Sequence, residues 1–171
     1  MKRLLIIVFL LIACSAYASS PYFNAGYSGN YWGDNLVTNP GFETGDLTGW
    51  TTSPTDGTAS VVTGQAQSET YAVSLATTTG SLGVVQNMSV SEGDELKLSG
   101  WTKKGAATNV QLRFYGCTGL DEYYSNTSST YVQYVYYYTV PAGCSTITVQ
   151  FRNDYNGTTA YGDSMSVRKK L

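Results

Sequence analysis

The stretch NLVTNPGFETGDLTGW, from Asn35 to Trp50, places turn-forming residues around Phe42 and Glu43. Glycine adopts positive φ angles without steric cost, and proline presets the φ angle that many turns need. The apolar side chain of Phe42 lies among these residues and needs a core to cover it. The stretch therefore predicts the start of a folded domain, with tight turns around a phenylalanine that anchors the first strand.

Downstream of this stretch, apolar and polar residues alternate, which is typical of strands with one buried face. Each alternating segment is bounded by turn residues such as Glu92-Gly93-Asp94 and Pro141-Ala142-Gly143, and a further turn is expected at Thr79-Gly80. No segment shows a helical period. The sequence therefore predicts an all-β fold, an antiparallel β-sandwich. The alternating segments cover residues 71–75, 84–90, 96–98, 110–114, 134–140, 147–151 and 161–167.

Length and composition limit the classes of function. The chain has 171 residues, of which 42% are hydrophobic, so it is long enough to bury the core of one domain. Only 13% of the residues are charged, histidine is absent, and the formal charge is -2. A surface that reads phosphates needs clustered lysine and arginine, so nucleic acid is not an expected partner.

The N-terminal residues MKRLLIIVFLLIACSAYASS resemble an export signal, with a basic start, an apolar run and the small-x-small pattern Ala16-Tyr17-Ala18. We expect a signal peptide over residues 1–18 and a secreted protein. The apolar run is shorter than the roughly 20 residues that cross a bilayer, so no transmembrane helix is expected. Alternatively, Leu11-Ile12-Ala13-Cys14 is similar to a lipobox, which would leave a lipid anchor on Cys14.

Cleavage after Ala18 removes two of the 10 basic residues, which leaves 8 against 12 acidic residues and a formal charge of -4. The segment 19–34 is rich in glycine, asparagine and tyrosine without any period, so we interpret it as a flexible arm. The folded domain is then expected over residues 35–171.

Cys117 and Cys144 are the cysteines of the expected domain, and disulfides persist in exported proteins. We predict a disulfide between them. A reactive thiol or a metal site is disfavoured because no histidine is available as a base or a ligand.

The opening stretch resembles the first motif of family 4/9-type carbohydrate-binding modules, which are galactose-binding-like jelly rolls. The matching residues are Asn35 to Gly45 and Gly49-Trp50, followed by Leu98-Ser99-Gly100-Trp101, Tyr138 to Gly143 and Ala160 to Val167. The resemblance spans Asn35 to Val167 and implies a jelly-roll β-sandwich that binds carbohydrate. Two positions depart from the pattern: Ser164 replaces the second of two aspartates, and Tyr131 stands where tryptophan is frequent.

The resemblance also implies a structural calcium ion between the first and last strands. Glu43 and Asp163 are the expected ligands, because Ca²⁺ prefers carboxylate and carbonyl oxygens. An alternative is that Glu43 only accepts hydrogen bonds from backbone amides of the following turn.

Carbohydrate recognition needs flat aromatic rings beside amide or guanidinium groups, because a pyranose has an apolar C–H face and a rim of hydroxyls. If the apolar residues of each strand face inward, aromatic and amide side chains share the outward face. Tyr123, Tyr124 and Tyr131 would either form a rim around this surface or be buried, and Trp50 is expected in the core. The predicted carbohydrate-binding residues are Trp101, Gln111, Arg113, Tyr115, Gln133 and Tyr137.

Catalysis has little support in the sequence. A nucleophile-base relay lacks histidine, and glycosidases need two carboxylates facing one cleft, whereas Asp94-Glu95 and Asp121-Glu122 lie in apparent turns. Three glycosylation patterns, beginning at Asn87, Asn126 and Asn156, are weak because a chain rich in serine and threonine produces them by chance.

Two functions therefore remain. The first is a secreted or surface-attached, non-catalytic module that binds a polysaccharide or glycan. The second is a structural subunit of an extracellular assembly, in which the arm at residues 19–34 pairs with the sheet edge of a neighbouring copy.

Overall fold

The computed structural model of the chain describes residues 31–155 and 157–171. The expected signal peptide with Cys14, arm residues 19–30 and Asn156 lie outside this part. The described chain forms strands and no helix, so the prediction of an all-β fold is confirmed, and no segment of it is a helix able to span a membrane. The strands are β1 (Thr51–Thr63), β2 (Tyr71–Ser89), β3 (Glu95–Lys103), β4 (Val110–Cys117), β5 (Leu120–Asn126), β6 (Val132–Thr139), β7 (Thr146–Asn153) and β8 (Thr159–Lys169).

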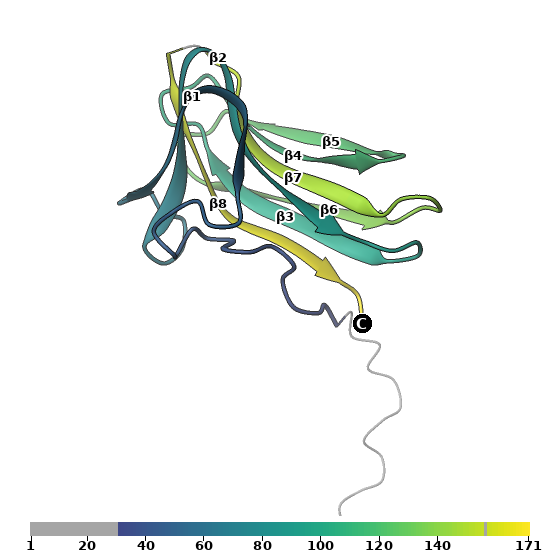
Figure 1. Cartoon of the computed structure of the whole chain (residues 1–171). Helices are drawn as coiled ribbons and strands as arrows, with labels where there is room; N and C mark the ends of the chain where they lie inside the picture. The colour runs from purple at the N-terminus through teal and green to yellow at the C-terminus, as the bar shows by residue number, and fades with distance from the viewer. Residues whose placement is uncertain (1–30, 156) are drawn as a thin grey trace, which may run out of the picture.

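All strand pairs are antiparallel, and the strands follow the order β5-β4-β7-β2-β8-β3-β6, with β1 beside β2. The long strand β2 belongs to both layers of the sandwich (Figure 1). Its residues Leu82 to Ser89 pair with β7, whereas Val73 to Ala76 pair with β8. One layer is therefore β5-β4-β7-β2 and the other is β2-β8-β3-β6, which is the jelly-roll type of β-sandwich.

The core fills the space between these layers. Leu112 and Phe114 of β4 are fully buried, and Leu112 approaches Gly100 of β3, where an added Cβ atom would lie 3.0 Å from the leucine side chain. The alternation in the sequence correctly predicted which side chains of β3, β4 and β7 face this core, whereas at the start of β8 Gly162, and not the alternating Tyr161, lies against Phe151. Its largest fully buried side chains are Phe42, Phe114, Phe151, Leu75, Leu82, Leu96, Leu98, Leu112, Leu120, Ile147, Met165 and Val73.

The opening stretch brings Phe42 and Trp50 into the core without forming a strand. Phe42 has a φ angle of 64°, so the backbone turns at this residue instead of extending. Its ring lies 5.2 Å from that of Trp50 and 6.2 Å from that of Phe151, measured between centroids. The expectation that Phe42 anchors the core is confirmed, whereas its expected place on the first strand is wrong because the turn residues bend the chain before β1 begins.

Three further features differ from the expected strands. The alternation did not identify β1, which pairs only with β2 and alternates between exposed and half-buried residues. It also missed β5, an edge strand that includes Asp121-Glu122. The expected turn at Thr79-Gly80 lies inside β2. Neither β1 nor β5 has a run of alternate buried apolar residues, so neither produces a readable alternation.

Residues Tyr31 to Asp34, the last part of the expected arm, lie beside the end of β8, and Figure 1 shows the start of the described chain near the C terminus. Trp32 forms an isolated bridge with Lys170, and the amide of Gly33 donates to the carbonyl of Lys169 at 2.7 Å. These contacts attach this part of the segment to the domain.

The disulfide between Cys117 and Cys144 is present, as predicted, with its Cα atoms 5.6 Å apart. It joins the end of β4 to the connection between β6 and β7.

Candidate functional site

The structure divides the six predicted carbohydrate-binding residues between opposite sides of the sandwich. Gln111, Arg113 and Tyr115 are on β4, in the layer β5-β4-β7-β2. The other three are on β3 and β6, in the layer β2-β8-β3-β6. The expectation of one shared surface is therefore wrong. Alternation predicts which side chains point away from the core, but strands of both layers have such side chains. Only the pairing of the strands shows to which layer each strand belongs.

We call the first of these surfaces the β4 face. Its residues lie in register across three strands, since Arg113 pairs with Gln150 of β7 on one side and with Tyr123 of β5 on the other. Cross-strand neighbours of this kind are close enough for their side chains to act together. The face consists of Gln111, Arg113 and Tyr115 of β4, Asp121, Tyr123 and Ser125 of β5, and Thr148, Gln150 and Arg152 of β7.

Arg113 lies at the centre of the β4 face. Its guanidinium carbon is 5.4 Å from the centroid of the Tyr115 ring, a cation–π contact that holds the side chain in place. Its contact with a carboxylate is a 3.9 Å ion pair with Asp121, whose side chain is 83% exposed. Such an exposed pair contributes little, so the donors of Arg113 remain accessible to a ligand.

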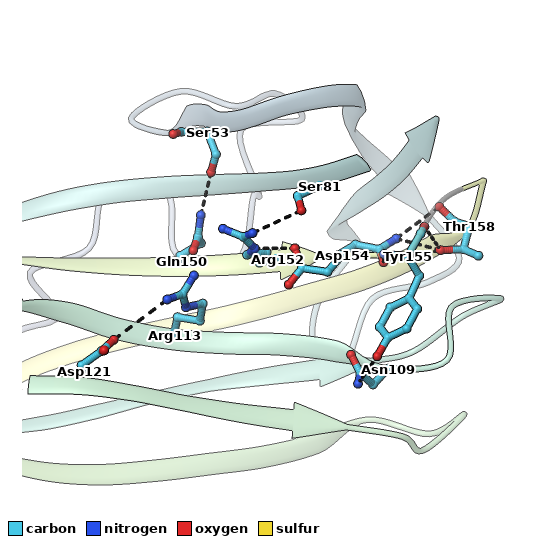
Figure 2. Close-up of polar contacts among 11 residues, drawn as sticks. Ser53, Ser81, Asn109, Arg113, Asp121, Gln150, Arg152, Asp154, Tyr155 and Thr158 are labelled. Carbon is cyan, nitrogen blue, oxygen red and sulfur yellow. Dashed lines mark hydrogen bonds and ion pairs between the residues drawn. The ribbon is translucent and has the colours of Figure 1, made fainter. Parts of the chain in front are cut away.

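A polar network lies beside Arg113 on β7, and Figure 2 shows Gln150 and Arg152 on this strand next to Arg113 on β4. The amide of Gln150 donates to the carbonyl of Ser53 at 2.6 Å. Arg152 forms an ion pair with Asp154 at 2.5 Å and donates to the hydroxyl of Ser81 at 3.2 Å. These contacts fix the direction of both side chains, which lowers the entropic cost of binding.

Two buried acceptors near this network have no hydrogen-bond partner within the described residues. They are the side-chain oxygens of Gln150 and of Asn109, which precedes β4 and donates its own amide to the Tyr155 hydroxyl at 2.8 Å (Figure 2). An unsatisfied buried acceptor costs free energy, and such groups concentrate where a ligand or water completes them.

Tyr123 is the aromatic residue that the sequence did not assign to the site. It is 62% exposed and lies on the β4 face, whereas it was expected beside a loop because β5 was missed. Of the three tyrosines expected to form a rim or be buried, the other two are covered. Tyr124 stacks on Tyr134 with ring centroids 4.7 Å apart, and the hydroxyl of Tyr131 donates to the carbonyl of Gln65 at 2.7 Å.

The opposite surface carries the other three predicted residues, and we call it the β3 face. Trp101 pairs with Gln133, and Tyr137 pairs with Lys97. Tyr137 is 61% exposed, whereas Trp101 is half-buried. The outward residues of the β3 face are Lys97, Ser99 and Trp101 of β3, Gln133, Val135 and Tyr137 of β6, and Ser166 and Arg168 of β8.

The two expected calcium ligands lie close together, although Glu43 is in the loop before β1 and Asp163 is on β8. One oxygen of each carboxylate faces Gly41, where an added Cβ atom would be 3.5 Å from Asp163 Oδ1 and 3.7 Å from Glu43 Oε1. Asp163 is fully buried, and none of the salt bridges among the described residues involves it. Burial raises the pKa of its carboxyl, against the opposing effect of backbone donors at Gln67 and Ser68.

This arrangement fits a hard cation in its chemistry, because a buried carboxylate without a cationic partner lies beside a second one. Glu43 also accepts hydrogen bonds from the backbone amides of Tyr71 and Thr70, at 3.0 and 3.3 Å. These amides lie at the start of β2 and just before it, and not in the turn that follows Glu43. No group of three or more acidic, histidine or cysteine residues occurs in the described chain. Backbone and hydroxyl oxygens would have to supply the remaining ligands.

A pocket of about 560 Å³ adjoins these carboxylates. Its walls come from the opening stretch, from the loop before β2 and from β8. Its lining includes the carboxylates Glu43 and Glu69, and Ser164, Ser166 and Arg168 from β8.

The adjacent acidic pair Asp121-Glu122 does not form a catalytic pair in this fold. Both residues lie on β5, where neighbouring side chains point to opposite sides of the strand. Asp121 lies on the β4 face. Glu122 lies near Tyr136 of β6, where burial and the charge of Glu122 raise the pKa of the Tyr136 hydroxyl. The two carboxylates therefore do not face one shared cleft, as glycosidase chemistry requires.

Comparisons with known proteins identify the architecture. No protein-family model matches the sequence, and no curated protein matches it either. Among solved structures, the chain is similar to TmCBM61 in complex with β-1,4-galactotriose, with a TM-score of 0.65 and 17% identity, over 81% of this chain and 100% of the other.

Two further structures have the same type of fold. A family 16 carbohydrate-binding module gives a TM-score of 0.61 with 20% identity, over 78% of this chain and 99% of the other. The CBM22-1 xylan-binding domain of Paenibacillus barcinonensis Xyn10C gives 0.58 with 19% identity, over 81% and 96%. These modules belong to several families, so the likeness does not select families 4 and 9. The chain has the jelly-roll β-sandwich fold of carbohydrate-binding modules.

Proposed function

We propose that the chain is a non-catalytic module that binds a polysaccharide through its β4 face. The observation that carries this proposal is the position of Arg113, which is held against the Tyr115 ring and lies in register between Tyr123 and Gln150. The similarity of the fold to several carbohydrate-binding modules supports the same function.

The chemistry of the β4 face matches that of a sugar chain. The exposed ring of Tyr123 offers a flat apolar surface for the C–H face of a pyranose. Arg113 and Gln111 offer donors and acceptors for hydroxyl groups beside that ring. Gln150 is only 2% exposed, so it supports the face from beneath and does not contact the sugar itself. The face therefore supplies both parts of carbohydrate recognition.

Replacing Tyr123 or Arg113 with alanine is expected to weaken binding to a neutral polysaccharide by about five- to thirtyfold, because each removes a contact worth about 1 to 2 kcal/mol. Xylan and β-1,4-galactan are suitable probes in affinity electrophoresis, followed by calorimetry with the oligosaccharide that binds. Tyr123→Phe keeps the ring and should retain most of the affinity.

Tyr137→Ala is the matched control, because it removes an equally exposed tyrosine from the opposite side of the sandwich. It should leave binding of the neutral polysaccharide unchanged. A folded wild-type protein that binds no glycan on an array, or a Tyr123→Ala variant with unchanged affinity, would refute the proposal.

We also propose that Glu43 and Asp163 hold a structural calcium ion. A bound ion would compensate the buried charge of Asp163 and tie the opening stretch to β8. Saturating calcium, at about one hundred times the dissociation constant, should stabilise the protein by about 2.7 kcal/mol. The midpoint of thermal unfolding, compared with and without a chelator, measures this effect.

Asp163→Asn and Glu43→Gln should each abolish the response to calcium, because both remove a carboxylate while keeping the size of the side chain. Asp121→Asn is the control for a lost charge, since Asp121 is exposed on the β4 face, and this variant should keep the response. An unfolding midpoint of the wild-type protein that is the same in calcium and in chelator would contradict the assignment.

A further inference from the structure

The β3 face has an aromatic pair that spans two strands. Trp32 lies beside the end of β8, and Tyr137 lies on β6, with β8 and β3 between them. Adjacent strands are about 4.8 Å apart, so the two backbones are separated by roughly 14 Å. The rings nevertheless meet with centroids 5.7 Å apart, so they lean toward each other over the sheet. The outer side of Tyr137 remains open, since this residue is 61% exposed.

Two cations accompany this aromatic pair. Lys97 pairs across the strands with Tyr137 on one side and with Arg168 on the other, so all three side chains project from the same face of the sheet. Within residues 31–155 and 157–171, neither cation has a carboxylate at salt-bridge distance. The acids at the end of β3 are already used, because Asp94 and Glu95 bind Lys169 and Lys170 at 2.6 Å each.

Arg168 is held in place by the protein. Its Nη1 donates to the carbonyl of Gly33 at 3.0 Å, and its Nε donates to the hydroxyl of Ser166 at 3.3 Å. These contacts leave Nη2 without a partner among the described residues. Arg168 also lines the 560 Å³ pocket, whose other charged lining residues are Glu43 and Glu69, so the cationic surface ends at this pocket.

We propose that the β3 face is a second binding surface, separate from the β4 face, for an acidic polysaccharide that carries uronic acid carboxylates. The apolar face of a uronic acid ring stacks on Tyr137, and its carboxylate accepts hydrogen bonds from Lys97 and Arg168. An anion fits this surface because two cations lie together without compensating carboxylates, and a carboxylate can accept charge-assisted hydrogen bonds from both. A carbohydrate is required because the exposed ring offers flat apolar area beside the charges.

The proposal has a structural consequence for the whole module. The two faces lie on opposite sides of the sandwich, so one molecule would hold two polysaccharide chains, a neutral one and an acidic one. It does not depend on the β4 face, because no residue is shared between the two surfaces.

The test uses polygalacturonate as the probe, with carboxyl-reduced polygalacturonate as its neutral counterpart, in affinity electrophoresis and calorimetry at low salt. The wild-type protein should bind the acidic polymer and lose most of this affinity with the reduced one. Lys97→Gln and Tyr137→Ala should each weaken binding by about tenfold, since each removes a charge-assisted or aromatic contact. No side-chain hydrogen bond or ion pair involves Lys97 within the described chain, so Lys97→Gln should keep the wild-type unfolding midpoint, whereas Tyr137→Ala loses the ring contact with Trp32 and should lower the midpoint slightly while the protein stays folded.

Two variants serve as controls. Lys104→Gln changes the net charge by the same amount in the loop after β3 and should alter the affinity by less than about twofold, because exposed charges away from the ligand are screened. Tyr123→Ala removes the exposed ring of the β4 face and should leave binding of polygalacturonate unchanged.

Four results would overturn the proposal. The first is equal binding of the acidic and the reduced polymer, and the second is equal weakening by Lys97→Gln and Lys104→Gln. The third is loss of polygalacturonate binding in Tyr123→Ala, which would place the acidic ligand on the β4 face. Dextran sulfate that binds more tightly, with the same dependence on Lys97, would show that the surface reads anionic charge and would overturn the assignment to uronic acids. None of these results changes the expected binding of neutral polysaccharide by the β4 face, so each proposal can be refuted without refuting the other.

Discussion

Replacing Phe42 with alanine is expected to destabilise the protein by about 3 to 5 kcal/mol, because the change removes a fully buried ring and leaves a cavity. The ring packs against Trp50 and Phe151, and it is the point at which the opening stretch enters the core. For a chain of this size the midpoint of thermal unfolding should fall by about 10 °C or more. Urea denaturation followed by tryptophan fluorescence measures the difference directly.

Tyr123→Ala provides the control for this change, because it removes a similar ring from a position that is 62% exposed. It should change the free energy of unfolding by less than about 0.5 kcal/mol. Phe42→Leu should lie between the two variants, since it keeps most of the buried apolar volume. An unfolding midpoint of Phe42→Ala equal to that of the wild-type protein would show that the opening stretch does not contribute to the core.

Removing the disulfide is expected to cost about 3.5 kcal/mol, the loop-entropy value for a loop of its size. Cys117 and Cys144 are separated by 27 residues in sequence, and the loop between them includes β5 and β6, which lie at the two ends of the strand order. The bridge therefore limits the freedom of the part of the unfolded chain that forms the outer strand of each layer. The double variant Cys117→Ser/Cys144→Ser should unfold at a lower urea concentration than the wild-type protein.

A reductant supplies a second measurement of the same effect. It should lower the midpoint of the wild-type protein to that of the double variant, and it should not change the double variant further. Equal midpoints for the oxidised wild-type protein and the double variant would contradict the expected contribution of the bridge.

The two proposed surfaces differ in how their aromatic residues are held. On the β4 face, Tyr115 contacts the guanidinium of Arg113, while Tyr123 remains exposed. On the β3 face, Tyr137 is supported by Trp32 from the segment before the domain proper. The residues just before Asn35 therefore take part in the second surface, although the sequence places them in an arm without a regular pattern.

The amino-acid sequence by itself determined the side of each central strand that faces the core. Leu112 and Phe114 are buried while Arg113 between them leaves the core, because successive side chains of a strand point to opposite sides and apolar side chains avoid water. The burial of Phe42 and Trp50 and the pairing of Cys117 with Cys144 were also predicted. These features depend on local pattern or on residue type alone.

Only the tertiary structure decided which outward side chains share a surface. Trp101 and Arg113 are both outward, yet they belong to opposite layers, because β3 pairs with β6 and β8 whereas β4 pairs with β5 and β7. The sequence contains the alternation of each strand but no local signal for its neighbour in the sheet. That choice depends on contacts between residues far apart in the chain, and for the same reason Tyr123 could be assigned to the β4 face only once the strands were paired.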